Sequence, residues 1–410
     1  MNIKRRLMGI LIVAACLLSV SIESFGQLSA SPRVIVPIVK PGQNDFFDIT
    51  AGGSHTCAIK YNGNVYCWGL NSTGQVGIWT TTTPCQGLSC ITRPAFVTTA
   101  SQVDAGMDHT CALSSAGAAT CWGNSTYGQV GNGNFGYQSE PLPVWGNHVF
   151  SSISAGMYST CGTASDGLIC WGAIVDSVHG SNPVQISSYN RFSSVSVGYL
   201  HACTLDAEGG LREIGCWGNN QLGQLGVDPA QFPNTNSSSG VWYSLLSSLG
   251  TAASRVTTQT DFTCADQTNG TVQCVGANGV GQLGNGQSTW TATFLAQTVG
   301  NGMHGASTGT DHACALDASG KAYCWGNGHW GQLGNASSAN FSTPQPVSGG
   351  LTFRKIAAGG LHTCGITTDN HIFCWGNNAY GQLGVGYVPP QNSNDPYRWT
   401  WAPIQALDPQ

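Results

Sequence analysis

The stretch HTCALSSAGAATCWGNSTYGQVGNG, from His109 to Gly133, contains two cysteines ten positions apart, a Cys-Trp-Gly step and a glycine-rich tail. A segment with these features could form a metal site, a nucleotide-binding loop or one unit of a repeat. The chain contains seven such units, whose first cysteines recur at intervals of 42 to 61 residues. An internal period of about 50 residues is typical of a propeller or an array. The stretch is therefore one unit of a repeat.

The units share a cysteine pair and two glycine motifs. Trp-Gly follows the second cysteine in every unit except the fifth, which has Val275-Gly276. Gly-Gln-(Leu/Val)-Gly begins at Gly74, Gly128, Gly223, Gly281, Gly331 and Gly381, and the third unit lacks it. The units are centred on seven pairs: Cys57 with Cys67, Cys111 with Cys121, Cys161 with Cys170, Cys203 with Cys216, Cys264 with Cys274, Cys314 with Cys324, and Cys364 with Cys374.

Each unit is predicted to contain a β-hairpin joined by a disulfide. In the first unit, HTCAIK and NVYCWG flank Tyr61-Asn62-Gly63, which is a hairpin signal. Folding about Asn62 places Cys57 opposite Cys67, at a separation within or near disulfide reach. Trp68 then points to the other face of the hairpin. We expect all seven pairs to form disulfides.

The remaining cysteines agree with a disulfide framework. Of the 17 cysteines, Cys16 lies in an N-terminal apolar run, so the other 16 form an even set. Cys85 and Cys90 fall in an insertion outside the repeat, and we expect a local disulfide there. Cys85 and Cys90, with four residues between them, form the single C-x2-4-C spacing in the chain, and structural zinc needs a second pair of ligands, so no metal site is predicted.

The composition indicates an all-β protein. Only 8% of the residues are charged and 56 are glycine, which suits many short strands and tight turns. The seven units predict a propeller or an array of small sheets, and N- and C-terminal strands that could share one sheet favour a closed ring. Residues 46–52 match the middle of a unit and 402–407 match the segment before it. We therefore expect the last strand to complete the first sheet, with residues 34–39 as the alternative.

The pattern A-G-x-x-H-(T/A)-C followed by C-W-G-N-N-x-x-G-Q-L-G resembles the regulator of chromosome condensation repeat, over about residues 46–407. The resemblance implies a seven-bladed propeller with about fifty residues in each blade. A cysteine pair in every blade is unusual for this family and fits an exported version. Some exported relatives inhibit β-lactamase by covering it with one face of the propeller, so enzyme inhibition is one implied function.

The N-terminus is predicted to be an export signal. Lys4, Arg5 and Arg6 precede the apolar run 7–20 and the exit Ser24-Phe25-Gly26. We expect a signal peptide at 1–26, a single propeller domain at 27–410 and a secreted, extracellular or periplasmic chain. No transmembrane segment is expected after signal removal. The alternative is a lipid anchor at Cys16, because Val13-Ala14-Ala15-Cys16 resembles a lipoprotein processing box.

Charge argues against nucleic-acid binding. The chain has 14 basic and 19 acidic residues. Loss of three basic residues and Glu23 with the signal leaves 11 and 18, a net charge of −7. No basic tract remains, so neither nucleic-acid binding nor a guanine-nucleotide-exchange type of regulation is expected.

No cofactor or catalytic group is predicted. G-x-G-x-x-G matches begin at Gly131, Gly279 and Gly326, but they lie on turns between blades rather than between a strand and a helix. His55, His109, His201, His312 and His362 fill one slot of the repeat. We interpret this histidine as a hydrogen-bonding spacer within each blade. The chain is therefore predicted not to be an enzyme.

The candidate binding residues are those that vary inside the constant repeat. Two positions between Ala-Gly and the histidine slot differ among the units and are expected to crowd one end of the ring. The predicted ligand-binding residues there are Met107, Asp108, Met157, Tyr158, Tyr199, Leu200, Asp261, Asp311 and Leu361. Aromatic residues in the insertions add Trp79, Tyr137 and Trp242. The alternatives are tolerant turn positions and aromatic rings that pack loops onto blades.

These features favour a monomeric, secreted, non-catalytic protein that binds an extracellular protein or glycan through its ring end and loops. An enzyme inhibitor is the sharpest form of this hypothesis. The alternatives are an enzyme that acts on glycans with Asp108, Asp261 or Asp311, and a cell-surface adhesin.

Overall fold

The computed structural model describes residues 42, 45–79, 83–174, 178–188, 192–206, 213–232, 234–235, 243–244, 253–390 and 398–409. Pro41–Gln410 form one compact unit. The described residues form strands and turns without a helix, and they contain no apolar helix long enough to cross a bilayer. The predicted signal peptide and Cys16 lie outside the described residues.

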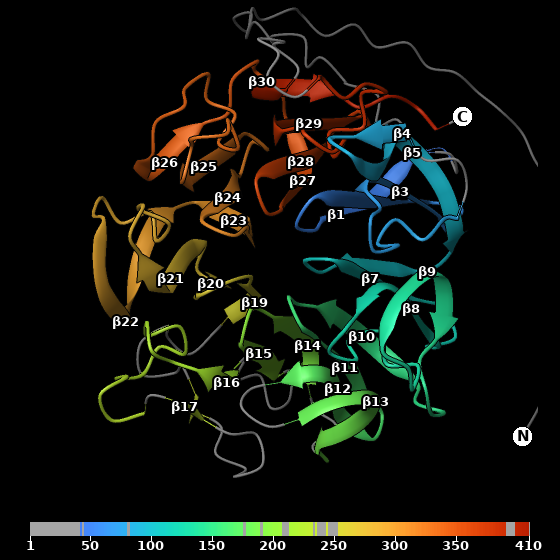
Figure 1. Cartoon of the computed structure of the whole chain (residues 1–410). Helices are drawn as coiled ribbons and strands as arrows, with labels where there is room; N and C mark the ends of the chain where they lie inside the picture. The colour runs from blue at the N-terminus through green and yellow to red at the C-terminus, as the bar shows by residue number, and fades with distance from the viewer. Residues whose placement is uncertain are drawn as a thin grey trace, which may run out of the picture. The chain divides into compact units, whose positions relative to one another are not determined.

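Seven antiparallel sheets surround a common axis, as Figure 1 shows, and the predicted seven-bladed propeller is confirmed. Blade 1 contains β1 (Phe46–Ala51), β2 (His55–Lys60), β3 (Asn64–Leu70), β4 (Thr83–Cys85) and β5 (Leu88–Thr99). Blade 2 contains β6 (Gln102–Ala105), β7 (His109–Leu113), β8 (Ala119–Ser125) and β9 (Gly136–Pro143). Blade 3 contains β10 (Phe150–Ala155), β11 (Ser159–Ala164), β12 (Gly167–Ile174) and β13 (Val178–Ser187).

The other four blades follow in chain order. Blade 4 contains β14 (Phe192–Val197), β15 (His201–Asp206), β16 (Ile214–Asn219), β17 (Asn234–Thr235) and β18 (Tyr243–Ser244). Blade 5 contains β19 (Ala253–Thr258), β20 (Phe262–Gln267), β21 (Thr271–Asn278) and β22 (Thr289–Asn301). Blade 6 contains β23 (Met303–Thr308), β24 (His312–Asp317), β25 (Ala322–Gly326) and β26 (Phe341–Pro346). Blade 7 contains β27 (Phe353–Ala358), β28 (His362–Thr367), β29 (Ile372–Asn377) and β30 (Trp399–Gln405).

All eight expected disulfides are present in the structure. In each blade the two cysteines face each other across the central hairpin, with Cα atoms 4.0–4.1 Å apart. The eighth disulfide joins Cys85 to Cys90 in the hairpin of β4 and β5. The blade disulfides join Cys57 to Cys67, Cys111 to Cys121, Cys161 to Cys170, Cys203 to Cys216, Cys264 to Cys274, Cys314 to Cys324, and Cys364 to Cys374.

The core consists of one hydrophobic cluster at each junction between blades, which we call a seam. At seam 1–2, Trp122 of blade 2 packs against Val76 and the disulfide of Cys57 and Cys67 in blade 1. The other seams repeat this arrangement, with Val275 in place of tryptophan at seam 4–5. The two faces of the predicted hairpin therefore meet: the tryptophan face of each blade covers the disulfide face of the blade before it.

The ring closes differently from the expectation. Strand β30 pairs with β29 of its own blade rather than with the first sheet, where β5 pairs with β3. Each blade is therefore a continuous stretch of chain. Strand β1 packs beside β27 and β28 to close seam 7–1 (Figure 1). Residues 34–39, the alternative closing segment, lie outside the described residues.

A belt of hydrogen bonds along the inner strands joins every seam except the closing one. At each of the other six, a side-chain oxygen two positions before the glycine slot of Ala-Gly accepts from a backbone amide of the next blade. The acceptors are Thr50, Asp104, Ser154, Ser196, Thr257 and Ser307. Blade 7 has Ala357 in this slot. There, the Arg354 guanidinium donates to the Phe46 and Phe47 carbonyls, and Lys355 forms an ion pair with Asp48.

Candidate binding site at the ring end

The Gly-Gln-(Leu/Val)-Gly loop joins each blade except blade 3 to the next. Gly74 has a φ of +85°, and a Cβ at this position would lie 2.6 Å from the Ser139 Cα of blade 2, so glycine is required. The Gln75 carbonyl accepts hydrogen bonds from Thr110 Oγ1 at 2.8 Å and from Trp122 Nε1 at 3.0 Å. The loop thus satisfies two buried donors of the following blade.

The repeated histidine completes a set of hydrogen bonds across the seams, which we call the seam lattice. His55 Nε2 lies 2.7 Å from Thr110 Oγ1. Because the threonine hydroxyl gives its single hydrogen to Gln75, it accepts from the histidine, which must carry its proton on Nε2. Burial is the largest cause that lowers the pKa of His55 to about 3, and the nearby His362 and His109 lower it further. The ring is therefore neutral at physiological pH.

Four other histidines make the same bond at 2.8–3.0 Å: His109 to Thr160, His201 to Thr263, His312 to Thr363 and His362 to Thr56. The expected hydrogen-bonding role is present, but the bond crosses a seam instead of staying within a blade. The sequence contained a signal for this that we missed. Where Ser159 and Phe262 replace the histidine, the next blade has Ala202 and Ala313 in place of the threonine.

The variable pairs lie immediately before these histidine slots and form a collar around the axis. The Met107 amide donates to the Gly156 carbonyl at 3.0 Å, and the Gly360 amide donates to the Gly52 carbonyl at 2.9 Å. Equivalent bonds from Gly53, Met157, Tyr199 and Thr310, and from the Thr260 hydroxyl, complete seven links. The structure therefore brings all seven pairs together at one end, which we call the ring end.

The preceding glycine allows the collar to be this tight. A Cβ on Gly106 would lie 2.3 Å from the Gly156 carbonyl oxygen, and one on Gly359 would lie 2.5 Å from that of Gly52. A side chain is excluded at these glycines, and blade 5, with Gln259 in this slot, is the exception, so most of the variation begins at the next two residues. The repeated Ala-Gly step thus fixes where the variable side chains emerge.

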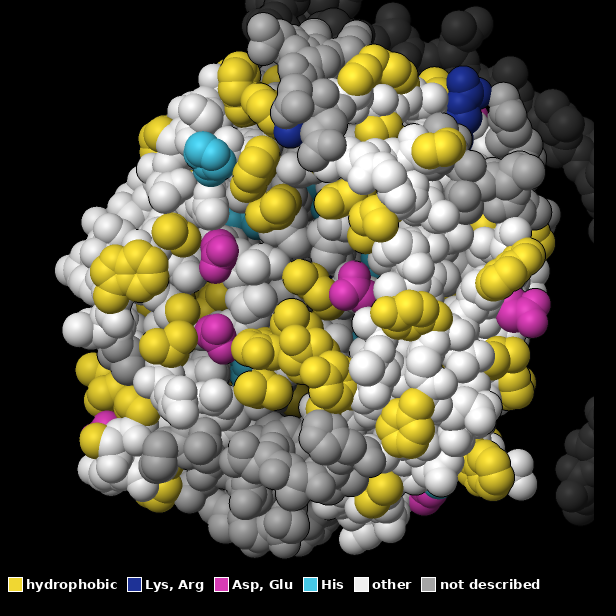
Figure 2. Space-filling model, viewed as in Figure 1, with side chains coloured by type: hydrophobic (Ala, Val, Ile, Leu, Met, Phe, Trp, Pro, Cys, Tyr) yellow, Lys and Arg dark blue, Asp and Glu magenta, His cyan; other side chains and the backbone are white. Residues whose placement is uncertain are grey.

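The ring-end side chains are half-buried rather than fully packed. All nine residues predicted from the pairs have intermediate exposure: Met107, Asp108, Met157, Tyr158, Tyr199, Leu200, Asp261, Asp311 and Leu361. The Tyr158 ring centroid is 4.6 Å from that of Tyr127 and 5.4 Å from that of Tyr199. These rings form a tyrosine row across blades 2 to 4. Figure 2 shows hydrophobic side chains gathered near the middle of this face with acidic side chains around them.

Burial perturbs the acidic residues of the ring end. It raises the pKa of Asp108 and of Asp311. Burial also raises the pKa of Asp261, and the nearby Asp311 adds to this shift. Among the described residues, no ion pair involves any of the three carboxyl groups. The ring end is therefore acidic at its edge, with carboxyl groups whose charge is not matched by a described basic side chain.

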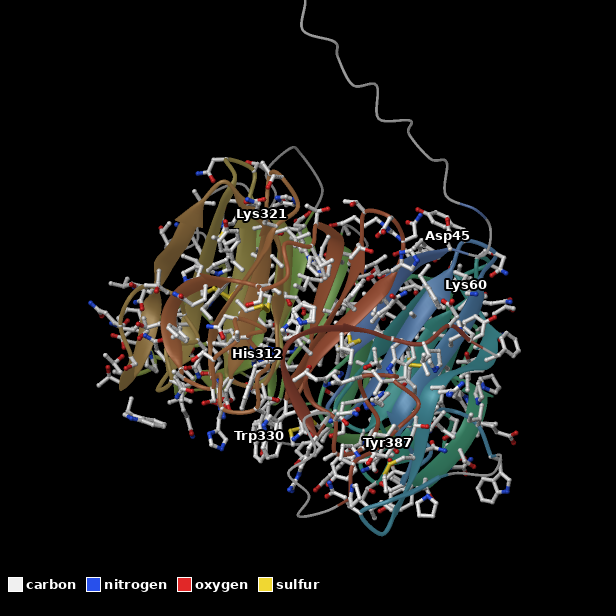
Figure 3. The ribbon with its side chains drawn as sticks, turned by 90° about the horizontal axis from the view of Figure 1, so that it is seen from above. Asp45, Lys60, His312, Lys321, Trp330 and Tyr387 are labelled. Atoms are coloured by element: carbon white, nitrogen blue, oxygen red, sulfur yellow. A yellow bond between two sulfur atoms is a disulfide. The ribbon has the colours of Figure 1, made fainter. Side chains whose placement is uncertain are left out.

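A second variable slot was missed at the sequence level. The residue before each Gly-Gln is Thr73, Tyr127, Leu222, Val280, Trp330 or Tyr380, and all six have intermediate exposure. In each, the backbone amide donates to the side-chain oxygen of the following glutamine. The ring centroid of Trp330 lies 5.8 Å from that of Trp399. Figure 3 places Trp330 at the opposite end of the blades from Lys60 and Lys321.

The predicted loop residues are separate from the ring end. Trp79 and Tyr137 line one groove at the outer side of seam 1–2. Trp242 lies outside the described residues. No sequence pattern places Trp79 and Tyr137 together, since 58 positions separate them along the chain.

The axial channel is narrow and polar. It is a cavity of about 250 Å³ lined by the inner strands of all seven blades. Asp104 accepts from the Ala155 amide and from Thr50 Oγ1, and burial raises its pKa. No group of three histidine, cysteine or acidic side chains among the described residues is arranged to hold a metal ion. The channel polar groups are largely committed to joining the blades.

Comparisons with known proteins agree with the repeat. Two models of the regulator of chromosome condensation (RCC1) repeat match residues 48–75, 100–129 and 353–382, and residues 62–113 and 319–366. The ultraviolet-B receptor UVR8 of Arabidopsis thaliana is 29% identical over 44% of this chain and 42% of the receptor. The probable E3 ubiquitin-protein ligase HERC6 of Homo sapiens is 26% identical over 44% of this chain and 19% of the ligase. The match thus spans less than half the length of either relative.

Solved structures share the architecture. Human WBSCR16 superimposes with a TM-score of 0.70 at 18% identity, covering 84% of this chain and 94% of that protein. Prp20p of Saccharomyces cerevisiae gives a TM-score of 0.69 at 16% identity, covering 89% of this chain and 88% of that protein. At these identities the likeness concerns the fold.

Proposed function

Since this chain is a seven-bladed propeller in which residues 48–129 and 319–382 match the regulator of chromosome condensation repeat, we propose that it is a non-catalytic binding protein whose ring end binds a protein partner. The observation that carries the proposal is the half-exposed tyrosine row, Tyr127, Tyr158 and Tyr199, set in a constant frame. Tyrosine is enriched at protein interfaces because its ring offers a large apolar area and a polar tip. A row of three supplies the anchor of such an interface.

The residues around the tyrosine row indicate which kind of partner surface would fit. Met107, Met157 and Leu200 extend the apolar surface, and Asp108, Asp261 and Asp311 add negative charge. A partner with an apolar protrusion flanked by lysine or arginine would complement both features. If the covered surface of the partner includes an active site, this chain inhibits an enzyme. The relatives named as a receptor and as a ligase are compatible with propellers that contact other proteins.

The proposed setting is outside the cytoplasm. Eight disulfides favour an oxidising compartment, and the export signal predicted from the N-terminal sequence is consistent with this. We propose a secreted or periplasmic monomer with a signal peptide at 1–26 and a propeller domain at 27–410. A lipid anchor at Cys16 would instead favour an adhesin.

A second candidate function rests on the acidic pair. Asp261 and Asp311 come from neighbouring blades, and the charge of Asp311 raises the pKa of Asp261. Burial raises the pKa of both groups, and a pair of carboxyl groups of which one keeps its proton to act as the acid is used in hydrolysis of a glycosidic bond. The binding function is favoured because six of the nine predicted ring-end residues are apolar or aromatic.

Affinity capture tests the proposal. The mature chain is immobilised and exposed to extracellular medium from its source, beside Tyr158→Ala and the control Tyr61→Ala. Tyr61 is an exposed tyrosine that follows Lys60 in the chain, and Figure 3 places Lys60 at the end opposite Trp330. We expect a protein retained by the wild type and Tyr61→Ala but lost with Tyr158→Ala. Capture that is identical for all three would contradict the ring-end site.

A parallel assay separates the two functions. Release of reducing sugar from a polysaccharide panel, abolished by Asp261→Asn and Asp311→Asn, would support the hydrolase and overturn the non-catalytic proposal. Unchanged polysaccharides together with a captured protein would support the binding function.

A further inference from the structure

A groove at the outer side of seam 1–2 lies apart from the ring end. It has a volume of about 420 Å³ and is lined by the loop 71–74, Ile78, Trp79, Ser89, Tyr137 and Ser139. Trp79 is 83% exposed and Tyr137 is 64% exposed. Two large rings left in water along one groove are a costly arrangement for a folded chain, and such exposure marks interaction sites.

The loop that carries Trp79 is held in place before any ligand arrives. The Asn71 side chain donates to the Ile78 carbonyl at 3.0 Å and accepts from the Val76 amide at 3.0 Å. Gly74, in the same loop, packs directly on the Ser139 backbone of β9, the strand that supplies Tyr137. The two walls are therefore fixed relative to each other, so binding would require little ordering.

The described residues that line the groove contribute neutral polar groups and no charged side chain. Ser72, Ser89 and Ser139 contribute hydroxyl groups that have no hydrogen-bond partner among the described residues. A charged ligand would lose hydration here without gaining an opposite charge. An uncharged ligand with many hydroxyl groups would lose less and would find donors and acceptors.

One backbone pair across the floor of the groove is already occupied. The Asn71 amide donates to the Ser89 carbonyl at 2.8 Å, which joins the two sides of the floor. A peptide strand that bound by backbone hydrogen bonds would find this pair occupied. Flat aromatic rings and free hydroxyl groups remain as the available chemistry.

From this arrangement we propose that the groove of Trp79 and Tyr137 binds an uncharged oligosaccharide chain. The apolar C–H face of a pyranose ring stacks on the indole and phenol rings, and the sugar hydroxyl groups bond to the serines. The two aromatic rings of this site do not belong to the ring-end pairs. A link between the groove and the ring end is Thr73, whose hydroxyl lies 3.3 Å from the Asp108 carbonyl.

Calorimetric titration of the mature chain with four neutral hexasaccharides tests the site: cellohexaose, chitohexaose, maltohexaose and mannohexaose. Hexagalacturonate is the charged comparison. We expect at least one neutral sugar to bind, and both Trp79→Ala and Tyr137→Ala to weaken that sugar at least tenfold. Trp290→Ala is the matched control, because Trp290 is 85% exposed and does not line this groove. It should bind the sugar as the wild type does.

Several results would overturn the site. One is the absence of heat with all four neutral sugars at about 5 mM, where even millimolar affinity would register. Others are equal binding of hexagalacturonate, unchanged affinity in Trp79→Ala, or binding of a proline-rich peptide where no sugar binds. Tyr158→Ala distinguishes this site from the ring end, because it should weaken protein capture while sugar affinity stays unchanged.

Discussion

Asp108 and His109 are neighbours in the chain, but their side chains lie in contrasting environments. The Asp108 side chain is half-exposed at the ring end, and its slot varies among the blades. The His109 side chain is fully buried in a seam and bonds to Thr160 of the next blade at 2.8 Å. The comparison shows that the residues repeated in most units are those that pack between blades. Variation begins at the residue where the collar releases the side chain toward solvent.

The seams themselves come in two kinds. Five join a histidine to a threonine, and two have lost both partners together, at Ser159 with Ala202 and at Phe262 with Ala313. A lone buried threonine or histidine would leave a polar atom unpaired, which costs more than replacing both by less polar groups. At each seam, the histidine and the threonine are thus either both present or both replaced.

Acid should produce the largest effect, and it should act on the seams. Burial lowers the pKa of His55, His109, His312 and His362 to about 3, and that of His201 to about 4. Because these values lie below that of the unfolded chain, the stability they contribute is complete above about pH 6.5 and is lost as the pH falls. We expect the free energy of unfolding to fall between pH 6.5 and 4. Asp104 and the three ring-end aspartates, whose pKa is raised, act in the opposite direction and reduce the slope.

Denaturant titrations at a series of pH values measure this slope while the disulfides stay intact. A variant that replaces one histidine–threonine pair should show a shallower slope. A flat profile in the wild type would show that the histidines are not buried in neutral form.

The next largest effect is expected for a seam tryptophan. Trp122→Ala removes a fully buried ring beside the disulfide of Cys57 and Cys67 and leaves the Gln75 carbonyl without one of its two donors. A loss of about 3–5 kcal/mol is typical of such a truncation. Trp290→Ala, at an exposed ring, should change stability by less than about 0.5 kcal/mol. Chemical denaturation at pH 7 checks both, and equal losses would contradict the proposed packing of the seams.

A ring-end substitution should reverse that pattern. Tyr158→Ala should weaken capture of the protein partner about thirtyfold, or about 2 kcal/mol, as expected for an interface anchor. Its unfolding midpoint should stay close to that of the wild type, because the ring is half-exposed. Surface plasmon resonance and thermal unfolding on the same preparations provide the two readings. Loss of stability equal to the loss of binding would place Tyr158 with the structural residues.

The smallest effect sharpens the comparison between the two kinds of seam. Thr110→Ala leaves the His55 Nε2–H without its acceptor and should cost about 1–2 kcal/mol. The double variant His55→Phe with Thr110→Ala imitates the natural Phe262 and Ala313 seam. It should recover part of that loss, and a double-mutant cycle measures the coupling. Additive losses would indicate that the two side chains act independently.

Much of the fold could be predicted because its determinants are local. The cysteine pair, the hairpin turn and the start of the Trp-Gly step lie within fourteen residues of each other in the first unit, from His55 to Trp68. The pairing of β30 could not be predicted, since its sequence fits the outer position of the first or the last blade equally well. The direction of the histidine bond depends on how neighbouring blades are staggered, although the coupled loss of its threonine was visible in the sequence.

The place of the candidate site in the repeat could be predicted from the sequence, but not all of the residues that form it. Variation inside a constant frame located the ring-end pairs, and the collar explains why they converge. The same reasoning applied to the slot before Gly-Gln would have found Tyr127 and Trp330. The groove of Trp79 and Tyr137 depends on contact between two blades, so no linear pattern announces it. The ligand-binding role of these residues stays a prediction.

The continuous blades also have a mechanical consequence. Because β30 stays in its own sheet, it does not cross seam 7–1, which is held by side-chain bonds such as those of Arg354 and by the repeated lattice. A tensile load applied through the first strand, β1, and the last strand, β30, would act on this seam first and would separate blade 7 from blade 1. Within each blade the disulfide would limit extension. The molecule would then lengthen as whole blades separate one after another, while the disulfide of each blade keeps its hairpin closed.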